Sequence, residues 1–481
     1  MRERLPGMRG PRREYGPARE GRRTSDPESP VAGRGARAGA RAIYGATAVL
    51  STLADRIRGI VGQGTPGVPV PAGIGSPDRE PECRDLTPLD GAWIDRCFVI
   101  ERRADPSEPH GCETIGTIAD CVTQSAGAVS LFASAAQAPF LFVDLETTGL
   151  NGGAGTHVFL IGCGWFTADG GFATRQFLLT RFEDERCLLQ AVATELERAG
   201  ALVSFNGKSF DAPLLETRFL FHRLEWVGGR LPHVDVLHPA RRFWRYDAGR
   251  VICVPQNAAC SLTALEHRLL GTMRKHDVAG IEIPARYFRF VRSGDAQPLV
   301  SVLEHNRLDL LTLAALTSRL LHLSQAGAMA ARSAGEALAL GHLYVRAGYE
   351  ARARDAFMQC IQMSRAPAGA FEPITIEAIC ALAQALRRAR RFDEAAACWQ
   401  RLADTRGCPA AVLREAIEAL AIHHEHRVRD LVTAKAFALR NLEADRHPRR
   451  TRAVQHRVAR LDRKLELKNQ KRELFALLET A

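Results

Sequence analysis

The feature of this sequence that most restricts its fold is an apolar segment that ends abruptly in acidic residues. Phe140–Val143 is a run of four apolar residues, which is typical of a buried central strand, and Asp144 and Glu146 follow it with one leucine between them. Successive side chains of a strand point to opposite faces, so both carboxylates are predicted to lie on the same face. Alternatively, the two acids have no function beyond providing the strand with a solvent-exposed end. The polar, turn-forming segment 147–150 makes that alternative less favoured.

The residues that follow predict an α/β domain. His157–Phe166 and Thr174–Leu179 have the pattern of strands and, with Phe140–Val143, suggest three antiparallel strands. The remaining predicted elements are a helix from the acids at 183–185 to Gly200, strands at Ala201–Phe205 and His233–Leu237, a helix capped by Ser261 that extends to Leu270, and a long helix over Leu299–Leu323. Together these elements predict a mixed five-stranded sheet that is flanked by helices.

Two further acidic segments stand in the same domain. Asn206 and Asp211 follow the predicted strand directly, which would turn Asp211 toward the first pair of acids. Alternatively, Asp211 only caps the helix that comes next. His305 and Asp309 are four residues apart, a spacing that places both on one helical face. A surface pair is the alternative there, but neighbouring leucines indicate that this helix is packed.

In this order the three segments read D-x-E, N-x3-F-D and H-x3-D, and they resemble the motifs of the DEDD 3′–5′ exonucleases. The resemblance is strongest to the YprB-type ribonuclease-H-like domain, which often stands beside tetratricopeptide repeats. It covers residues 139–322 and implies the ribonuclease-H-like fold. The last motif combines the spacing of the tyrosine subgroup with a histidine, while Glu304 occupies the position of the histidine in the other subgroup. Both subgroups therefore stay open.

The resemblance also implies catalysis by two divalent metal ions, Mg²⁺ or Mn²⁺, about 3.5–4 Å apart. Asp144 would contact both ions, Glu146 and Asp309 would hold the ion on the side of the nucleophile, and Asp211 would hold the second. His305 would orient or deprotonate the attacking water. Carboxylate oxygens are the ligands that such hard ions prefer, so the residue types suit this chemistry.

Four other polar residues are weaker candidates for substrate binding. Thr147 and Asn206 more plausibly shape loops whose backbone amides face the substrate. Lys208 is a candidate phosphate contact, as are the arginines of segment 241–245, although charge near a helix start is ordinarily only solvated. Asp235 lies in a predicted strand, where a structural role is favoured over contact with the substrate.

The chain of 481 residues divides into five predicted regions. They are a disordered Arg/Gly/Pro-rich leader at 1–84, an N-terminal extension at 85–138 with a strand over Trp93–Glu101, the exonuclease-like domain at 139–325, tetratricopeptide-like repeats at 335–445, and a capping helix at 446–481. The Ala- and Gly-rich stretch 324–333 is the expected hinge.

The leader is the most basic part of the chain, because residues 1–42 hold 11 arginines against five acids. A basic tail of this kind can bind nucleic acid non-specifically. A solvated tail, or a start codon assigned too far upstream, explains the same composition.

The repeats are predicted from matching positions in a helical pattern. Leu340, Tyr344, Ala353 and Phe357 recur 42 residues later as Leu382, Leu386, Ala395 and Trp399, and a weaker third copy follows after a further 38 residues with Thr433 and Phe437 in its second helix. These spacings match the small and large positions of tetratricopeptide helix pairs. Such a region would serve as a scaffold for a protein partner.

The sequence predicts a soluble, cytoplasmic protein without a membrane partner. Its N-terminus begins with charged residues instead of the apolar core of a signal peptide, and its longest uncharged stretch, 59–77, contains four prolines. The twelve cysteines lack the close pairing of common zinc sites and suit reduced thiols.

Two function classes remain open. One is a metal-dependent nuclease, most plausibly a 3′–5′ exonuclease on single strands of DNA or RNA. The alternative is a catalytically weak nucleic-acid-binding scaffold that acts through its repeats. All four carboxylates are present, which favours the enzyme.

Overall fold

The computed structural model describes residues 84–149, 155–248, 260–275, 277–364, 373–444 and 448–479. All of them fall within one compact unit, Gly75–Ala481. The leader predicted at 1–84 thus lies outside the described residues except for Arg84. Within the described ranges, no helix combines the length and the apolar character that crossing a membrane requires.

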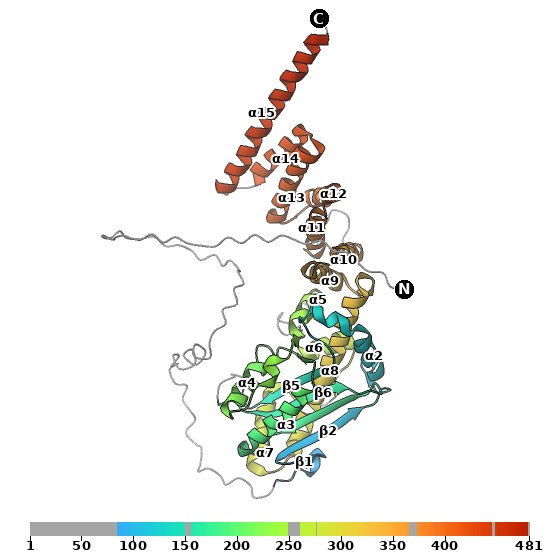
Figure 1. Ribbon diagram of the computed structural model, residues 1–481, viewed down its shortest axis with the longest axis vertical. Coiled ribbons are helices and arrows are strands. Elements are labelled where there is room, and N and C mark those ends of the chain that lie inside the picture. The colour runs from blue at the N-terminus through green and yellow to red at the C-terminus, as the bar shows by residue number, and fades with distance from the viewer. Residues whose placement is uncertain are drawn as a thin grey trace, which may run out of the picture. The chain divides into compact units, whose positions relative to one another are not determined.

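A mixed sheet lies at the centre of the α/β domain (Figure 1). It has seven strands in the order β1-β2-β7-β6-β5-β8-β9. Its strands are β1 (Ala92–Ile94), β2 (Cys97–Ala104), β5 (Phe140–Thr147), β6 (Val158–Phe166), β7 (Phe172–Leu178), β8 (Ala201–Ser204) and β9 (His233–Asp235). Strands β5, β6 and β7 are antiparallel, and β8 and β9 run parallel to β5. The predicted mixed sheet is therefore confirmed.

The sheet has two more strands than the five predicted, and both come from the N-terminal extension. The segment Trp93–Glu101, predicted as one strand, is a hairpin of β1 and β2 that pairs with β7. The chain reverses at Asp95, whose φ of 52° is in the left-handed region that aspartate tolerates in turns. Residues 85–138 thus extend the central sheet, and they also form a small ribbon of β3 (Pro109–His110) and β4 (Glu113–Thr114).

Helices cover both faces of the sheet (Figure 1). They are α2 (Ile115–Ser125), α3 (Glu185–Glu197), α4 (Asp211–Phe221), α5 (Leu237–Ala248), α6 (Leu262–Leu265), α7 (Ile283–Ser293) and α8 (Val300–Ala326). Apolar side chains of α3, α4 and α7 share a core with Leu141, Val143 and Leu145 of β5. Those of α2, α5 and most of α8 share a second core with Phe140 and Phe142. The alternation along β5 therefore separates the two layers.

The C-terminal region is entirely helical over its described residues. Its helices are α9 (Ala334–Ala347), α10 (Glu350–Met363), α11 (Pro373–Arg388), α12 (Phe392–Asp404), α13 (Ala410–His423), α14 (Leu431–Ala444) and α15 (Pro448–Glu479), and each packs against the next. A Cβ atom at Gly341 of α9 would overlap the Phe357 ring of α10, so the small–large pairing inferred from the sequence is a direct helix contact. In the second helix of the third pair, the buried alanines Ala434 and Ala438 stand one residue later than Thr433 and Phe437, the positions that the sequence alignment gave.

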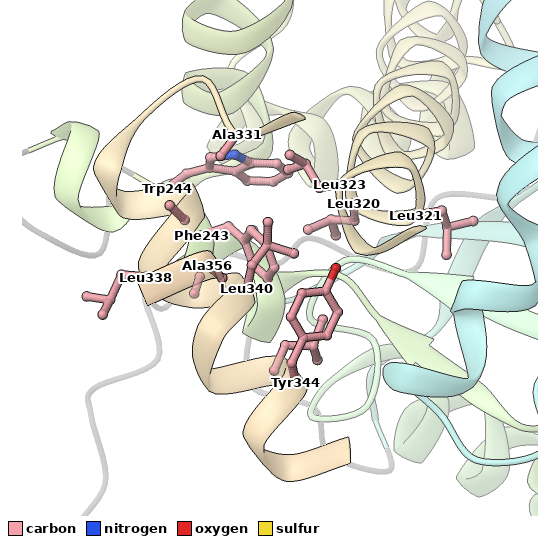
Figure 2. Close-up of a cluster of buried hydrophobic side chains, with 14 of the residues drawn as sticks. Phe243, Trp244, Leu320, Leu321, Leu323, Ala331, Leu338, Leu340, Tyr344 and Ala356 are labelled. Atoms are coloured by element: carbon pink, nitrogen blue, oxygen red, sulfur yellow. The ribbon is translucent and has the colours of Figure 1, made fainter. Parts of the chain in front are cut away.

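Figure 2 shows that the α/β domain and the first helical pair share one core. Phe243 and Trp244 of α5 pack among leucines of α8 and α9, and Trp244 Nε1 donates a hydrogen bond to Glu336 Oε1 at 3.0 Å. Arg319 of α8 also pairs with Glu336, at 2.7 Å. The side chains on both sides of the expected hinge at 324–333 are thus held together.

Candidate active site

Strand β5 presents the first two acids on one face, as its alternation predicted. Asp144 and Glu146 continue the face of Phe140 and Phe142, while Leu145 between them belongs to the opposite core. Both carboxylates are partly buried, and they lie on the half of β5 near its carboxyl end. Since β5 and β8 are parallel, the loop after β8 emerges at the same edge of the sheet.

Asn306 of α8 holds Asp144 in place. Its Nδ2 donates to Asp144 Oδ2 at 2.8 Å and to the Asp144 carbonyl oxygen at 3.2 Å. Its Oδ1 accepts a hydrogen bond from Gln176 Nε2 at 2.8 Å, and its side chain is fully buried. A Cβ atom at Gly162 of β6 would overlap Asn306 Oδ1, so only glycine leaves room for this amide. The sequence assigned no role to Asn306, Gln176 or Gly162.

Asp211 reaches the same edge from the start of α4. The loop before it requires unusual backbone, because Asn206 has a φ of 68° and a Cβ atom at Gly207 would overlap Ser204 Oγ. The Asp235 carboxylate fixes this loop: it accepts hydrogen bonds from the backbone amides of Asn206 at 2.8 Å and Lys208 at 3.1 Å. Asp235 also accepts from the first amide of α5, and its side chain is 1% exposed. These contacts favour the structural role for Asp235.

Asp309 and His305 contribute a third group of charges from α8. Asp309 Oδ1 accepts a hydrogen bond from Arg274 Nη2 at 2.6 Å, and Arg274 also pairs with Glu266 at 2.7 Å. His305 Nδ1 lies 2.6 Å from Asp277 Oδ1, and its Nε2 lies 3.5 Å from Asp309 Oδ2. The predicted pairing of His305 and Asp309 on one helical face is present. Its partners Arg274 and Asp277, in the segment before α7, were not predicted.

Burial and neighbouring acids raise the pKa of three of these carboxylates. Burial, followed by the charges of Asp309, Glu146 and Asp211, raises the pKa of Asp144 well above its ordinary range. Burial and the charges of Asp309, Asp211 and Asp277 raise the pKa of Glu146 to about 8. Burial and Asp235 raise the pKa of Asp211 to about 7. Perturbed carboxylates that converge from separate elements are characteristic of functional sites.

The donor set fits hard divalent cations. The four side chains supply only oxygen donors: Asp144, Glu146, Asp211 and Asp309. A cation bound among them would neutralise the negative charge that they bring together. Among the described residues, however, no three His, Cys, Asp or Glu side chains already form a metal-coordinating group. Arg274 provides the positive charge nearest to Asp309 instead.

The other predicted residues have less direct positions. Thr147 Oγ1 donates to the Gly149 carbonyl oxygen at 2.9 Å and shapes its loop. Lys208 and Asn206 are exposed beside Asp211, where they remain accessible to a substrate. Glu304 is half exposed and pairs with Arg307 at 2.8 Å, so it does not take part in the cluster.

Two comparisons with known proteins show the family of the α/β domain. Residues 141–321 match the family model of the RNase_H superfamily, from β5 to α8. The chain is also similar to YprB of Bacillus subtilis (strain 168), an uncharacterized protein. The two are 30% identical over 383 residues, which are 76% of this chain and 86% of that protein.

Proposed function

Because this chain belongs to the YprB family of the ribonuclease H superfamily, we propose that it is a metal-dependent 3′–5′ exonuclease acting on single-stranded nucleic acid. Superfamily membership indicates a nuclease-like action on nucleic acid. The observation that carries the finer proposal is the convergence of four acids from three elements, in which Asp309 and Asp211 both raise the pKa of Asp144 and of Glu146.

Each side chain has a proposed task. Asp144 would contact two Mg²⁺ or Mn²⁺ ions, Glu146 and Asp309 would hold one of them, and Asp211 would hold the other. Such ions, when bound, stabilise the charge that develops during phosphodiester hydrolysis and make water a better nucleophile. His305 accepts a proton from the attacking water through Nε2, because its Nδ1 is already engaged by Asp277.

The proposed function divides residues 139–481 into regions with different roles. We assign catalysis to residues 139–325, a tetratricopeptide-like scaffold to 335–445 and a cap to 446–481. The packing of each helix from α9 to α15 on the next supports the scaffold, and a cluster of Ala434, Ala438 and Leu461 supports the cap. A protein partner would bind this scaffold.

The ion pair between Asp309 and Arg274 favours the alternative, a nucleic-acid-binding scaffold without catalysis, because it engages one proposed metal ligand. The two functions differ in a direct test. Single- and double-stranded DNA and RNA, labelled at the 5′ or the 3′ end, are incubated with the full chain in Mg²⁺, Mn²⁺ or EDTA.

An exonuclease of the proposed polarity shortens 5′-labelled single strands progressively and releases mononucleotides at once from 3′-labelled ones, only when the ion is present. Intact substrates in both ions, together with retained binding, would establish the scaffold instead.

A further inference from the structure

Helix α5 exposes a row of three arginines and one histidine along one face. His238, Arg241, Arg242 and Arg245 are all exposed, and their spacing of three, one and three residues places them on a single helical stripe. We call these four residues, together with Arg346 of α9, the cationic stripe. The site described above uses none of them.

The opposite face of α5 fixes the direction of this stripe. Phe243 and Trp244 are buried in the core that joins α5 to α8 and α9 (Figure 2). The hydrogen bond from Trp244 to Glu336 prevents rotation of the helix about its axis. The arginines therefore project outward from a helix whose opposite face is packed in the core, and not from a loop.

One end of the stripe adjoins the carboxylate site. His238 Nε2 lies 4.0 Å from Asp235 Oδ2. The same Asp235 carboxylate binds the backbone amides of Asn206 and Lys208, in the loop that leads to Asp211. A ligand that lies along α5 thus arrives at the proposed catalytic edge of the sheet.

The other end continues onto the helical region. α5 packs against α9, where the exposed Arg346 stands close enough to Arg242 that, in addition to burial, this like charge lowers the pKa of Arg346. No described carboxylate forms an ion pair with Arg241, Arg242 or Arg346. Arginines that are held near one another without an anionic partner form a surface that an anion would stabilise.

We propose that the cationic stripe binds the phosphate backbone of single-stranded nucleic acid and guides the strand from the helical region into the carboxylate site. This inference rests on the proposed function and adds the path of its substrate. From His238 to Arg245 the helix rises about 10 Å, the length of about three phosphates of a stacked strand. Arginine suits this task because its planar group binds phosphate oxygens in pairs.

Equilibrium binding of a fluorescein-labelled 20-nucleotide oligo(dT) or oligo(U) to the full chain tests the proposal. EDTA prevents hydrolysis during the measurement. The test variant is Arg241→Gln/Arg242→Gln, which removes two charges and preserves helix propensity. The matched control is Arg289→Gln/Arg292→Gln, which removes two exposed charges from α7, a helix packed in the other core.

We expect the α5 variant to bind about tenfold more weakly, while the α7 variant binds as the parent does. The plot of log binding constant against log salt concentration should also become shallower by about 1.4, the value for two phosphate contacts on a single strand. Arg346→Gln should weaken binding of a 20-nucleotide strand and leave binding of a trinucleotide unchanged.

Equal losses in the α5 and α7 variants, or no loss in either, would overturn the proposed path. So would displacement of the oligonucleotide by polyglutamate as effectively as by unlabelled oligonucleotide, because the stripe would then be a general anion surface. Hydrolysis by the parent is scored separately in Mg²⁺. Binding that depends on the stripe without hydrolysis would refute the exonuclease and leave the path intact.

Discussion

Glu185 and Asp144 are both enclosed carboxylates of the α/β domain, but their surroundings are opposite. Burial alone would raise the pKa of Glu185, yet hydrogen bonds from His157, Arg218 and His222 lower it to about 2. Arg218 Nε donates to Glu185 Oε1 at 2.6 Å, and both side chains are 2% exposed. Asp144 has instead one neutral donor, Asn306, and three acidic neighbours.

The difference separates a charge that the fold satisfies from one that we propose binds metal. The fold satisfies Glu185 completely, so its negative charge is available to nothing else. Around Asp144 the fold supplies one arginine, Arg274, which pairs with Asp309, and the remaining acidic charge destabilises the protein unless a cation binds. The predictions below test this contrast.

The largest expected effect is on catalysis at the uncompensated cluster. Asp144→Asn should lower the hydrolysis rate by about 10³-fold or more, since one anionic ligand of both proposed ions is lost. Its melting temperature should stay equal or rise, because a repelling charge is removed. Asp355→Asn, an exposed change on α10, is the matched control. Wild-type activity in Asp144→Asn would place the metal site elsewhere.

The compensated cluster should respond in stability instead. Arg218→Met leaves Glu185 buried without its main partner, which should cost about 3–5 kcal/mol of the free energy of unfolding. Urea denaturation measures this loss. The double variant Arg218→Met/Glu185→Leu should recover much of it, as no lone charge remains. A single variant as stable as the parent would contradict the contrast.

His305 should show an intermediate effect on rate. General acid–base assistance contributes about 10²–10⁴-fold, so His305→Ala should keep more activity than Asp144→Asn. His305→Tyr should retain more still, because the motif spacing is that of the tyrosine subgroup. Rates in Mn²⁺, with thermal melts as a folding control, compare the three. If His305→Ala equals the parent, His305 is only a helix-face residue.

The smallest expected effect is a pH-dependent stabilisation by metal. Folding raises the pKa of Glu146 to about 8 and that of Asp211 to about 7, so the metal-free fold holds protons that the unfolded chain releases. The contribution of these two carboxyls to stability is therefore fully present at low pH and is lost as pH rises through 7 to 8.

A bound divalent ion offsets this decline. At about 100 times its Kd it should add about 2.7 kcal/mol, and the increase in melting temperature should be larger at pH 8 than at pH 6. Asp144→Asn should abolish most of the increase. A metal effect independent of pH would argue against binding at these carboxylates.

Much of the α/β domain was predictable because its signals are local. The alternation along Phe140–Thr147 and the apolar run before it specify a strand without knowledge of its neighbours. The turn at Asp95 was missed, since a single aspartate gives no strong turn signal. The shared core of Trp244 and Tyr344 was missed because it joins residues far apart in sequence. That shared core argues against a hinge at 324–333. Limited proteolysis of the stretch 324–333 would test whether the chain opens there.

The acids of the site were predictable for a different reason: their spacing forms a known motif. The residues that position them were not. Asn306 is an amide on a helix, which ordinarily indicates a solvent-facing position, and only the fold buries it against Asp144. Arg274 lies in an irregular segment, so nothing local connects it to Asp309. The sequence therefore predicted the acids of the candidate site, and the tertiary structure showed which residues position them.

The position of the Asn306 side chain depends on Gly162 of β6, a strand that carries none of the four acids. A side chain at position 162 would overlap the Asn306 amide and displace it. Replacement of Asn306 itself would leave Asp144 without its hydrogen-bond donor. We therefore expect a related chain with all four acids but a larger residue at 162 to keep the motif and to lose the hydrogen bond that positions Asp144. The residue at 162 thus reports on the geometry of the site, which the acids alone do not.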